Sequence, residues 1–101
     1  MSNGPDEFLQ CSNGPLPRSM ESRAYFSDDR REFALCRSDA LEYLRWCEDN
    51  GLKVLGFDIW MPTRPGPTVV DAGGFNGDAF ACRTVIQDYP GDPVFNIWAE
   101  P

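Results

Sequence analysis

Residues 38–61 read SDALEYLRWCEDNGLKVLGFDIWM and predict a helix followed directly by a strand. Ser38 or Asp39 can cap the start of the helix. Glu42, three residues after Asp39, completes the reciprocal capping pattern that satisfies the first backbone N–H groups. Gly51 provides the left-handed residue at which helices commonly end. The stretch therefore predicts one well-defined helix connected to a strand by a very short turn.

The predicted helix has an apolar side and a charged side. At about 100° per residue, positions on one side recur every three or four residues. The apolar positions are Ala40, Leu41, Leu44 and Cys47, widened by Tyr43 and Trp46, and the opposite side carries Glu42, Arg45 and Asp49. We therefore expect one side of this helix to be buried.

Residues 52–61 are too rich in β-branched and aromatic side chains to continue the helix, and they predict a strand. Successive side chains of a strand alternate between its two faces, so the segment divides into two sets. The expected core set is Leu55, Phe57, Ile59 and Met61, and the mixed set is Val54, Gly56, Asp58 and Trp60.

The rest of the chain predicts an N-terminal arm and further strands. Residues 1–22 are rich in Ser, Asn, Gly and Pro and predict a flexible or weakly structured arm, whereas residues 23–101 predict a single domain. Strands are expected at 32–37, 68–70, 80–86 and 94–98, with a proline-rich turn at 62–67 and a glycine-rich connection at 72–78. A short helix capped by Ser27 competes with the first of these strands. Because short connections favour antiparallel pairing, we expect an α+β fold with one main helix packed on a small antiparallel sheet of roughly three to five strands.

Length and charge restrict the classes of function. The 101 residues carry a formal net charge of −7, from 16 acidic and 9 basic side chains. This charge disfavours direct binding to nucleic acid or to an anionic membrane, and it favours a partner with a basic surface. We expect a cytoplasmic protein without a membrane helix, because the chain shows no apolar leader and no apolar run of about 18 residues.

The residue types needed for catalysis are sparse. The sequence contains no His, which removes the commonest general base and metal ligand. Cys11, Cys36, Cys47 and Cys82 show no Cys-x-x-Cys spacing and are expected to be reduced and mostly buried. The glycines after Asp71 lack both the lysine of a phosphate-binding loop and the alternating ligands of a calcium loop. We therefore expect no enzymatic activity, no cofactor and no metal site.

Three short motifs within the helix and strand resemble one protein family. They are DALE at 39–42, EDNG at 48–51 and VLGFDIW at 54–60. These motifs resemble the small immunity proteins of bacterial polymorphic toxin systems catalogued as immunity protein forty, with Phe57 in place of the family's second glycine. The resemblance implies a protein that binds a cognate toxin domain and neutralises it by occluding the active site.

Six residues are candidate contacts for such a partner. Carboxylates beside an aromatic edge can pair with Lys or Arg on a basic protein. An acid within an apolar strand must face solvent, pair with an Arg or accept backbone hydrogen bonds. The candidates are Glu42, Trp46, Glu48 and Asp49 on the helix and Asp58 and Trp60 on the strand. Structural roles, as solvated acids and core tryptophans, are the alternative for each.

Two other functions fit the same composition. An acidic inhibitor that mimics nucleic acid, of the kind that phages encode, would act on a nuclease or defence complex and would need its carboxylates in regular rows. A small enzyme or an enzyme accessory subunit would need an activated cysteine in an ordered pocket.

Overall fold

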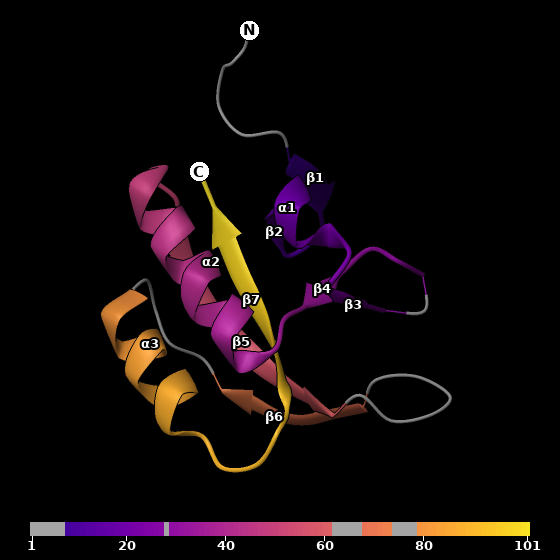
Figure 1. The fold of residues 1–101 in the computed structure, drawn as a ribbon, viewed down its shortest axis with the longest axis vertical. Coiled ribbons are helices and arrows are strands. Elements are labelled where there is room, and N and C mark those ends of the chain that lie inside the picture. The colour runs from indigo at the N-terminus through magenta and orange to yellow at the C-terminus, as the bar shows by residue number, and fades with distance from the viewer. Residues whose placement is uncertain (1–7, 28, 62–67, 74–78) are drawn as a thin grey trace, which may run out of the picture.

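A main helix packs on an antiparallel sheet in the computed structural model, which describes residues 8–27, 29–61, 68–73 and 79–101 (Figure 1). The elements are β1 (Phe8–Cys11), β2 (Gly14–Pro17), α1 (Arg18–Glu21), β3 (Tyr25–Phe26), β4 (Phe33–Ala34), α2 (Arg37–Asp49), β5 (Lys53–Met61), β6 (Thr68–Gly73), α3 (Ala79–Asp88) and β7 (Val94–Glu100). The main sheet has the order β6-β5-β7, and β1–β2 and β3–β4 form separate antiparallel hairpins. The α+β class is therefore confirmed.

The helix α2 begins one residue before the predicted cap. Cys36 is the N-cap residue, and it makes no side-chain hydrogen bond to the first turn. Asp39, expected as a cap, is instead nearly buried and accepts a hydrogen bond from Arg23 Nε at 2.9 Å. At the other end the prediction holds, because Gly51 has a left-handed φ of 70° and the helix ends at Asp49.

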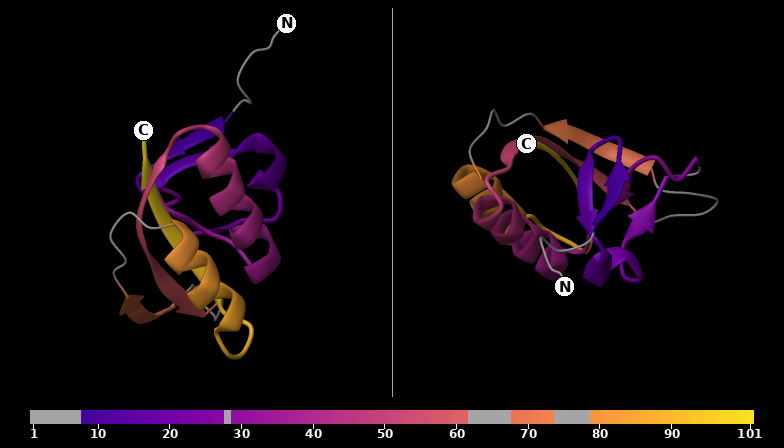
Figure 2. Two further views of the ribbon diagram at one scale, coloured as in Figure 1. Left: turned by 90° about the vertical axis from the view of Figure 1, so that its left-hand side faces the viewer. Right: turned by 90° about the horizontal axis from the view of Figure 1, so that it is seen from above.

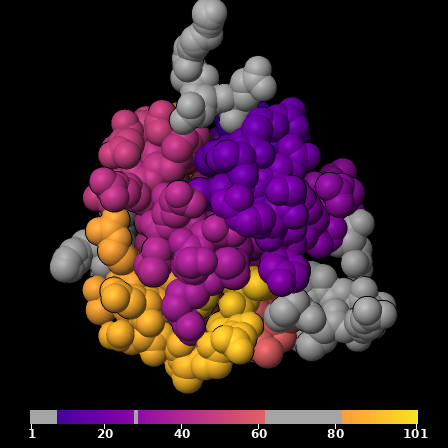
Figure 3. Space-filling model, viewed as in Figure 1, coloured from indigo at the N-terminus to yellow at the C-terminus, as the bar shows by residue number. Residues whose placement is uncertain are grey.

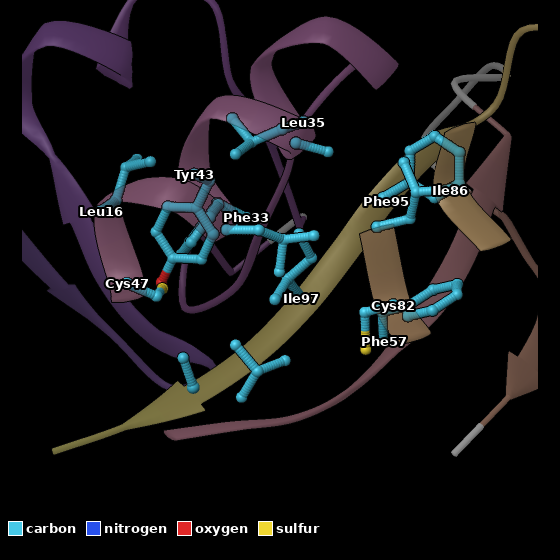
Figure 4. Close-up of a cluster of buried hydrophobic side chains, with 14 of the residues drawn as sticks. Leu16, Phe33, Leu35, Tyr43, Cys47, Phe57, Cys82, Ile86, Phe95 and Ile97 are labelled. Atoms are coloured by element: carbon cyan, nitrogen blue, oxygen red, sulfur yellow. The ribbon is translucent and has the colours of Figure 1, made fainter. Parts of the chain in front are cut away.

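The core lies between the two longer helices and the main sheet. Figure 2 shows α2 and α3 side by side over β5 and β7. Figure 4 shows the buried side chains that fill this space from both sides, with Tyr43 of α2 beside Phe33 and Ile97. The Phe33 and Tyr43 rings pack edge to face with their centroids 5.4 Å apart, an arrangement that aromatic pairs favour.

A β-bulge changes which side chains of β5 reach the core. The pairing of β5 with β7 shifts register between Val54 and Gly56. Leu55 is the extra residue, and it reverses the alternation of buried and exposed side chains along β5. Val54 is therefore buried, whereas Leu55 is 36% exposed. Phe57 and Ile59 are buried as predicted, but the predictions that Leu55 and Met61 are core residues were wrong.

The segment 80–86, predicted as a strand, belongs to the helix α3. Cys82 and Ile86 are both fully buried and lie four residues apart, which is the spacing of one side of a helix. Arg37, at the start of α2, donates hydrogen bonds from Nε to the Ile86 carbonyl at 3.1 Å and from Nη2 to the carbonyls of Tyr89 and Gly91. This guanidinium therefore joins the start of α2 to carbonyls at and just beyond the end of α3.

The N-terminal segment also differs from the prediction. Residues 8–21, expected to belong to a weakly structured arm, form β1, β2 and α1, and Leu16 and Met20 are buried in the core. The expected arm at 1–7, the proline-rich turn at 62–67 and residues 74–78 of the glycine-rich connection lie outside the described residues. Strands predicted at 32–37, 68–70 and 94–98 correspond to β4, β6 and β7.

Asn13, at the tip of the β1–β2 hairpin, joins this hairpin to two other strands. Its side chain is buried and donates from Nδ2 to the Ile97 carbonyl at 2.6 Å and to the Phe33 carbonyl at 3.2 Å. The Phe33 amide donates to Asn13 Oδ1 at 3.1 Å, and the Ala99 amide donates to the Asn13 carbonyl at 2.9 Å. A Cβ at Gly14 would lie 2.8 Å from the Ala99 carbonyl oxygen, so this close approach requires glycine. Asn13 therefore pairs with the edge of β7 at Ile97 and Ala99, beyond the bridge that Leu35 makes with Phe95.

Replacing Asn13 with Ala is expected to lower the free energy of unfolding by about 3 kcal/mol, because it leaves buried backbone groups of β4 and β7 without partners. Urea unfolding would measure this loss. Asn50→Ala, which removes an exposed amide bonded to the Trp46 carbonyl at 2.8 Å, is the matched control and is expected to cost less than about 1 kcal/mol. Equal losses in both variants would contradict the role assigned to Asn13.

Candidate interaction surface on helix α2

The outer side of α2 brings together three of the six predicted contact residues. A shallow hollow on this side is lined by Ser38, Leu41, Glu42, Arg45, Trp46 and Asp49. These positions follow the helical repeat, whereas the inner side of the same helix buries Ala40, Tyr43, Leu44 and Cys47. We call the six lining residues the α2 surface.

The carboxylates near this surface differ in their ion pairs. Glu48 pairs with Arg83 of α3, and Glu42 Oε2 lies 3.9 Å from Arg23 Nη2. Both pairs are solvent-exposed, so each contributes little to stability. Among the described residues Asp49 makes no salt bridge, and it is exposed. Asp49 is therefore available to an external cation.

The last turn of α2 has an unfavourable charge for a helix end. The partial negative charge of the helix dipole lies at the C-terminus, where Lys or Arg normally compensates it. The last turn of α2 contains no basic residue and ends with Glu48 and Asp49. Arg83 of α3 compensates Glu48, so Asp49 is the carboxylate beside which an external cation would find uncompensated negative charge.

Trp46 is held in place by contacts on its inner side. Its ring stacks on Tyr43 with centroids 5.8 Å apart and planes inclined by 22°. The Tyr43 hydroxyl is buried and donates to the Pro15 carbonyl at 2.7 Å, and burial raises the pKa of this hydroxyl well above its ordinary value. The half-buried indole thus has a fixed orientation while part of it remains accessible.

A second hollow adjoins Trp46 on the side of the N-terminal hairpin. It is lined by Phe8, Gln10, Pro15, Trp46, Asn50, Leu52 and Pro101. We call it the hairpin groove. In Figure 3 the N-terminal segment and α2 lie against each other on the face that the view presents. The sequence did not indicate Phe8 or Gln10, because their proximity to α2 depends on the hairpin that Asn13 holds in place.

Asp58 and Trp60 are separate from the α2 surface. Trp60 is 4% exposed and packs with Ala34 and Val94 in a cluster distinct from the main core. Asp58 is half-buried and lies opposite Asn96 in the backbone pairing of β5 with β7. Burial raises the pKa of Glu32, and the nearby charge of Asp58 contributes to the same shift. The burial of Trp60 favours the structural alternative for this residue.

The cysteines are reduced and mostly buried: Cys11, Cys47 and Cys82 are buried, and Cys36 is half-buried. Burial raises the pKa of Cys47 to about 12, and burial also raises the pKa of Cys11. A raised pKa keeps a thiol protonated and unreactive.

Comparison with known proteins adds no relative: no protein-family model, curated protein or solved structure matches the chain. In the described part of the chain no helix is long and apolar enough to cross a membrane. Across the same residues no three His, Cys, Asp or Glu side chains come together as metal ligands would.

A thiol reagent at pH 8 is expected to modify Cys36 rapidly in the native protein and Cys11, Cys47 and Cys82 only after unfolding. Cys47 should remain mostly protonated even at pH 10, because burial raises its pKa to about 12, so its native labelling should stay much slower than that of Cys36. Mass spectrometry of the labelled peptides would identify the sites. Rapid native labelling of Cys47 would restore the hypothesis of an activated cysteine.

Trp60→Ala is expected to lower the free energy of unfolding by about 3 kcal/mol, because it leaves a cavity in a buried cluster. Trp46→Ala should cost less, since its indole is only half-buried. Denaturant unfolding of both variants makes the comparison. A fully stable Trp60→Ala protein would contradict the structural role of Trp60.

Proposed function

We propose that this chain is an immunity-type protein that binds a toxin domain with a basic surface and neutralises it by occluding the active site. The observation that carries the proposal is the position of Trp46, an oriented and accessible aromatic side chain beside the exposed carboxylates of Glu42 and Asp49. The resemblance of residues 39–60 to immunity proteins of polymorphic toxin systems agrees with this function.

The α2 surface has the properties of a binding centre. Interface hot spots are commonly Trp, Tyr or Arg residues surrounded by contacts that exclude water. Because Trp46 already stacks on Tyr43, little conformational entropy would be lost when a partner covers it. Carboxylates around such an anchor increase the association rate with a basic partner.

The chain would inhibit the toxin by pairing with its cationic side chains and blocking its active site, without reacting with it. A toxin that acts on an anionic substrate needs cationic side chains in its active site. Asp49 and Glu42 would pair with such side chains, and the body of the domain would exclude the substrate. The proposed site of action is the cytoplasm, where a toxin would otherwise reach its target.

The nucleic-acid mimic is less well supported by the charges on α2. Glu42 and Glu48 lie beside Arg23 and Arg83, and Arg45 lies within the α2 surface. Arginines therefore interrupt the carboxylates, whereas a phosphate backbone presents an unbroken row of negative charge.

Calorimetric titration with the toxin domain encoded beside this chain is expected to give nanomolar binding that weakens as salt is raised, because the contacts pair opposite charges. Trp46→Ala and the double variant Glu42→Gln/Asp49→Asn should each weaken binding at least about tenfold.

Asp88→Asn and Asp92→Asn, which change exposed acids outside the α2 surface, are the matched controls and should bind like the original protein. Binding that is absent, or that is lost equally in the controls, would contradict the proposed function for that toxin.

A further inference from the structure

We propose that the hairpin groove receives an apolar side chain of the partner, and that a Lys or Arg next to it reaches Asp49. The inference rests on the proposed function and specifies the chemistry of the segment that binds. The part of the partner that binds here is thus a short basic segment with one apolar side chain, the anchor, which enters the groove.

The lining of the hairpin groove suits an apolar side chain of the partner. Phe8, Leu52 and the ring of Trp46 form its walls, together with two prolines. Phe8 is 46% exposed, so much of its ring is accessible to a partner. Covering these walls with an aliphatic or aromatic side chain would remove apolar surface from water.

Two side-chain amides supply the polar groups of the groove. Gln10 Nε2 donates to the Cys11 carbonyl at 3.1 Å, and Asn50 Nδ2 donates to the Trp46 carbonyl at 2.8 Å. These bonds orient the two amides, and each uses one of the two N–H groups. The amide oxygens can accept from the backbone N–H groups of a peptide or from a guanidinium, and the second N–H groups can donate to peptide carbonyls.

The basic part of the occupant follows from charge complementarity. Trp46 belongs to both the hairpin groove and the α2 surface, so an anchor in the groove lies next to Asp49. The negative end of the α2 dipole lies at Asn50, and no basic residue occupies the last turn. A second copy of this chain would bring its own net charge of −7 to the contact and is therefore disfavoured.

Chemical-shift mapping of the isotope-labelled full chain with three capped pentapeptides tests the proposal. The peptides are Gly-Leu-Arg-Arg-Gly, Gly-Ser-Arg-Arg-Gly, which lacks the anchor, and Gly-Leu-Glu-Glu-Gly, which reverses the charge. The first should bind with a dissociation constant of about 1 mM and shift the Trp46 indole and the Gln10 and Asn50 amides. The other two should bind at least about fivefold more weakly.

Variants of two equally exposed aromatic residues provide the internal control. Phe8→Ala should weaken binding of the first peptide about fivefold, whereas Tyr25→Ala, which changes a 43% exposed ring outside the groove, should not. Equal binding of the Leu and Ser peptides, shifts located elsewhere, or an unchanged affinity in Phe8→Ala would overturn the inference.

Phe8→Ala and the Glu42→Gln/Asp49→Asn double variant, both titrated with the toxin domain, separate this inference from the proposed function. Toxin binding that is weakened by the Glu42→Gln/Asp49→Asn double variant and unchanged by Phe8→Ala would overturn the groove inference and leave the function standing. Peptide binding in the groove without any toxin binding would support the inference and remove the toxin as partner.

Discussion

The buried amide of Asn13 joins the N-terminal hairpin to β4 and to the main sheet. An amide side chain can be fully buried at low cost only when both its oxygen and its nitrogen have partners, and here those partners are Phe33 and Ile97. Together with Leu35, which pairs with Phe95, Asn13 covers the edge of β7 that would otherwise present unpaired backbone groups. It also fixes the β1–β2 hairpin, and with it the position of Phe8 beside α2.

Helix α2 connects the stability of the fold to its surface chemistry. Its inner side carries Tyr43, whose bond to Pro15 joins the helix to the hairpin and orients Trp46 above it. The sequence identified Glu42, Trp46 and Asp49 as candidate contacts, but its apolar pattern placed Trp46 on the buried side of the helix, whereas the structure places it beside the two carboxylates. The groove beside them was not predictable, since its other wall comes from a hairpin distant in the chain.

The sequence predicted α2, β5 and β7 well because each has a strong local pattern. It failed for α3, where β-branched residues favour a strand and the helix depends on burial of Cys82 and Ile86 and on carbonyl capping by Arg37, 49 residues away from Ile86. It also failed for the N-terminal hairpin, whose polar composition is compensated by the contact of Asn13 with Ile97, 84 residues along the chain. Both predictions were wrong because these elements depend on hydrogen bonds between residues far apart in the sequence, which local residue patterns do not reveal.

Hydrogen exchange of the full chain with and without the toxin domain would show whether the partner binds across α2 and the N-terminal hairpin. Slower exchange on binding is expected at residues 8–11 and 46–52, which border the hairpin groove and the end of α2. Protection confined to β3, β5 and β6, with unchanged exchange at α2, would contradict this binding mode.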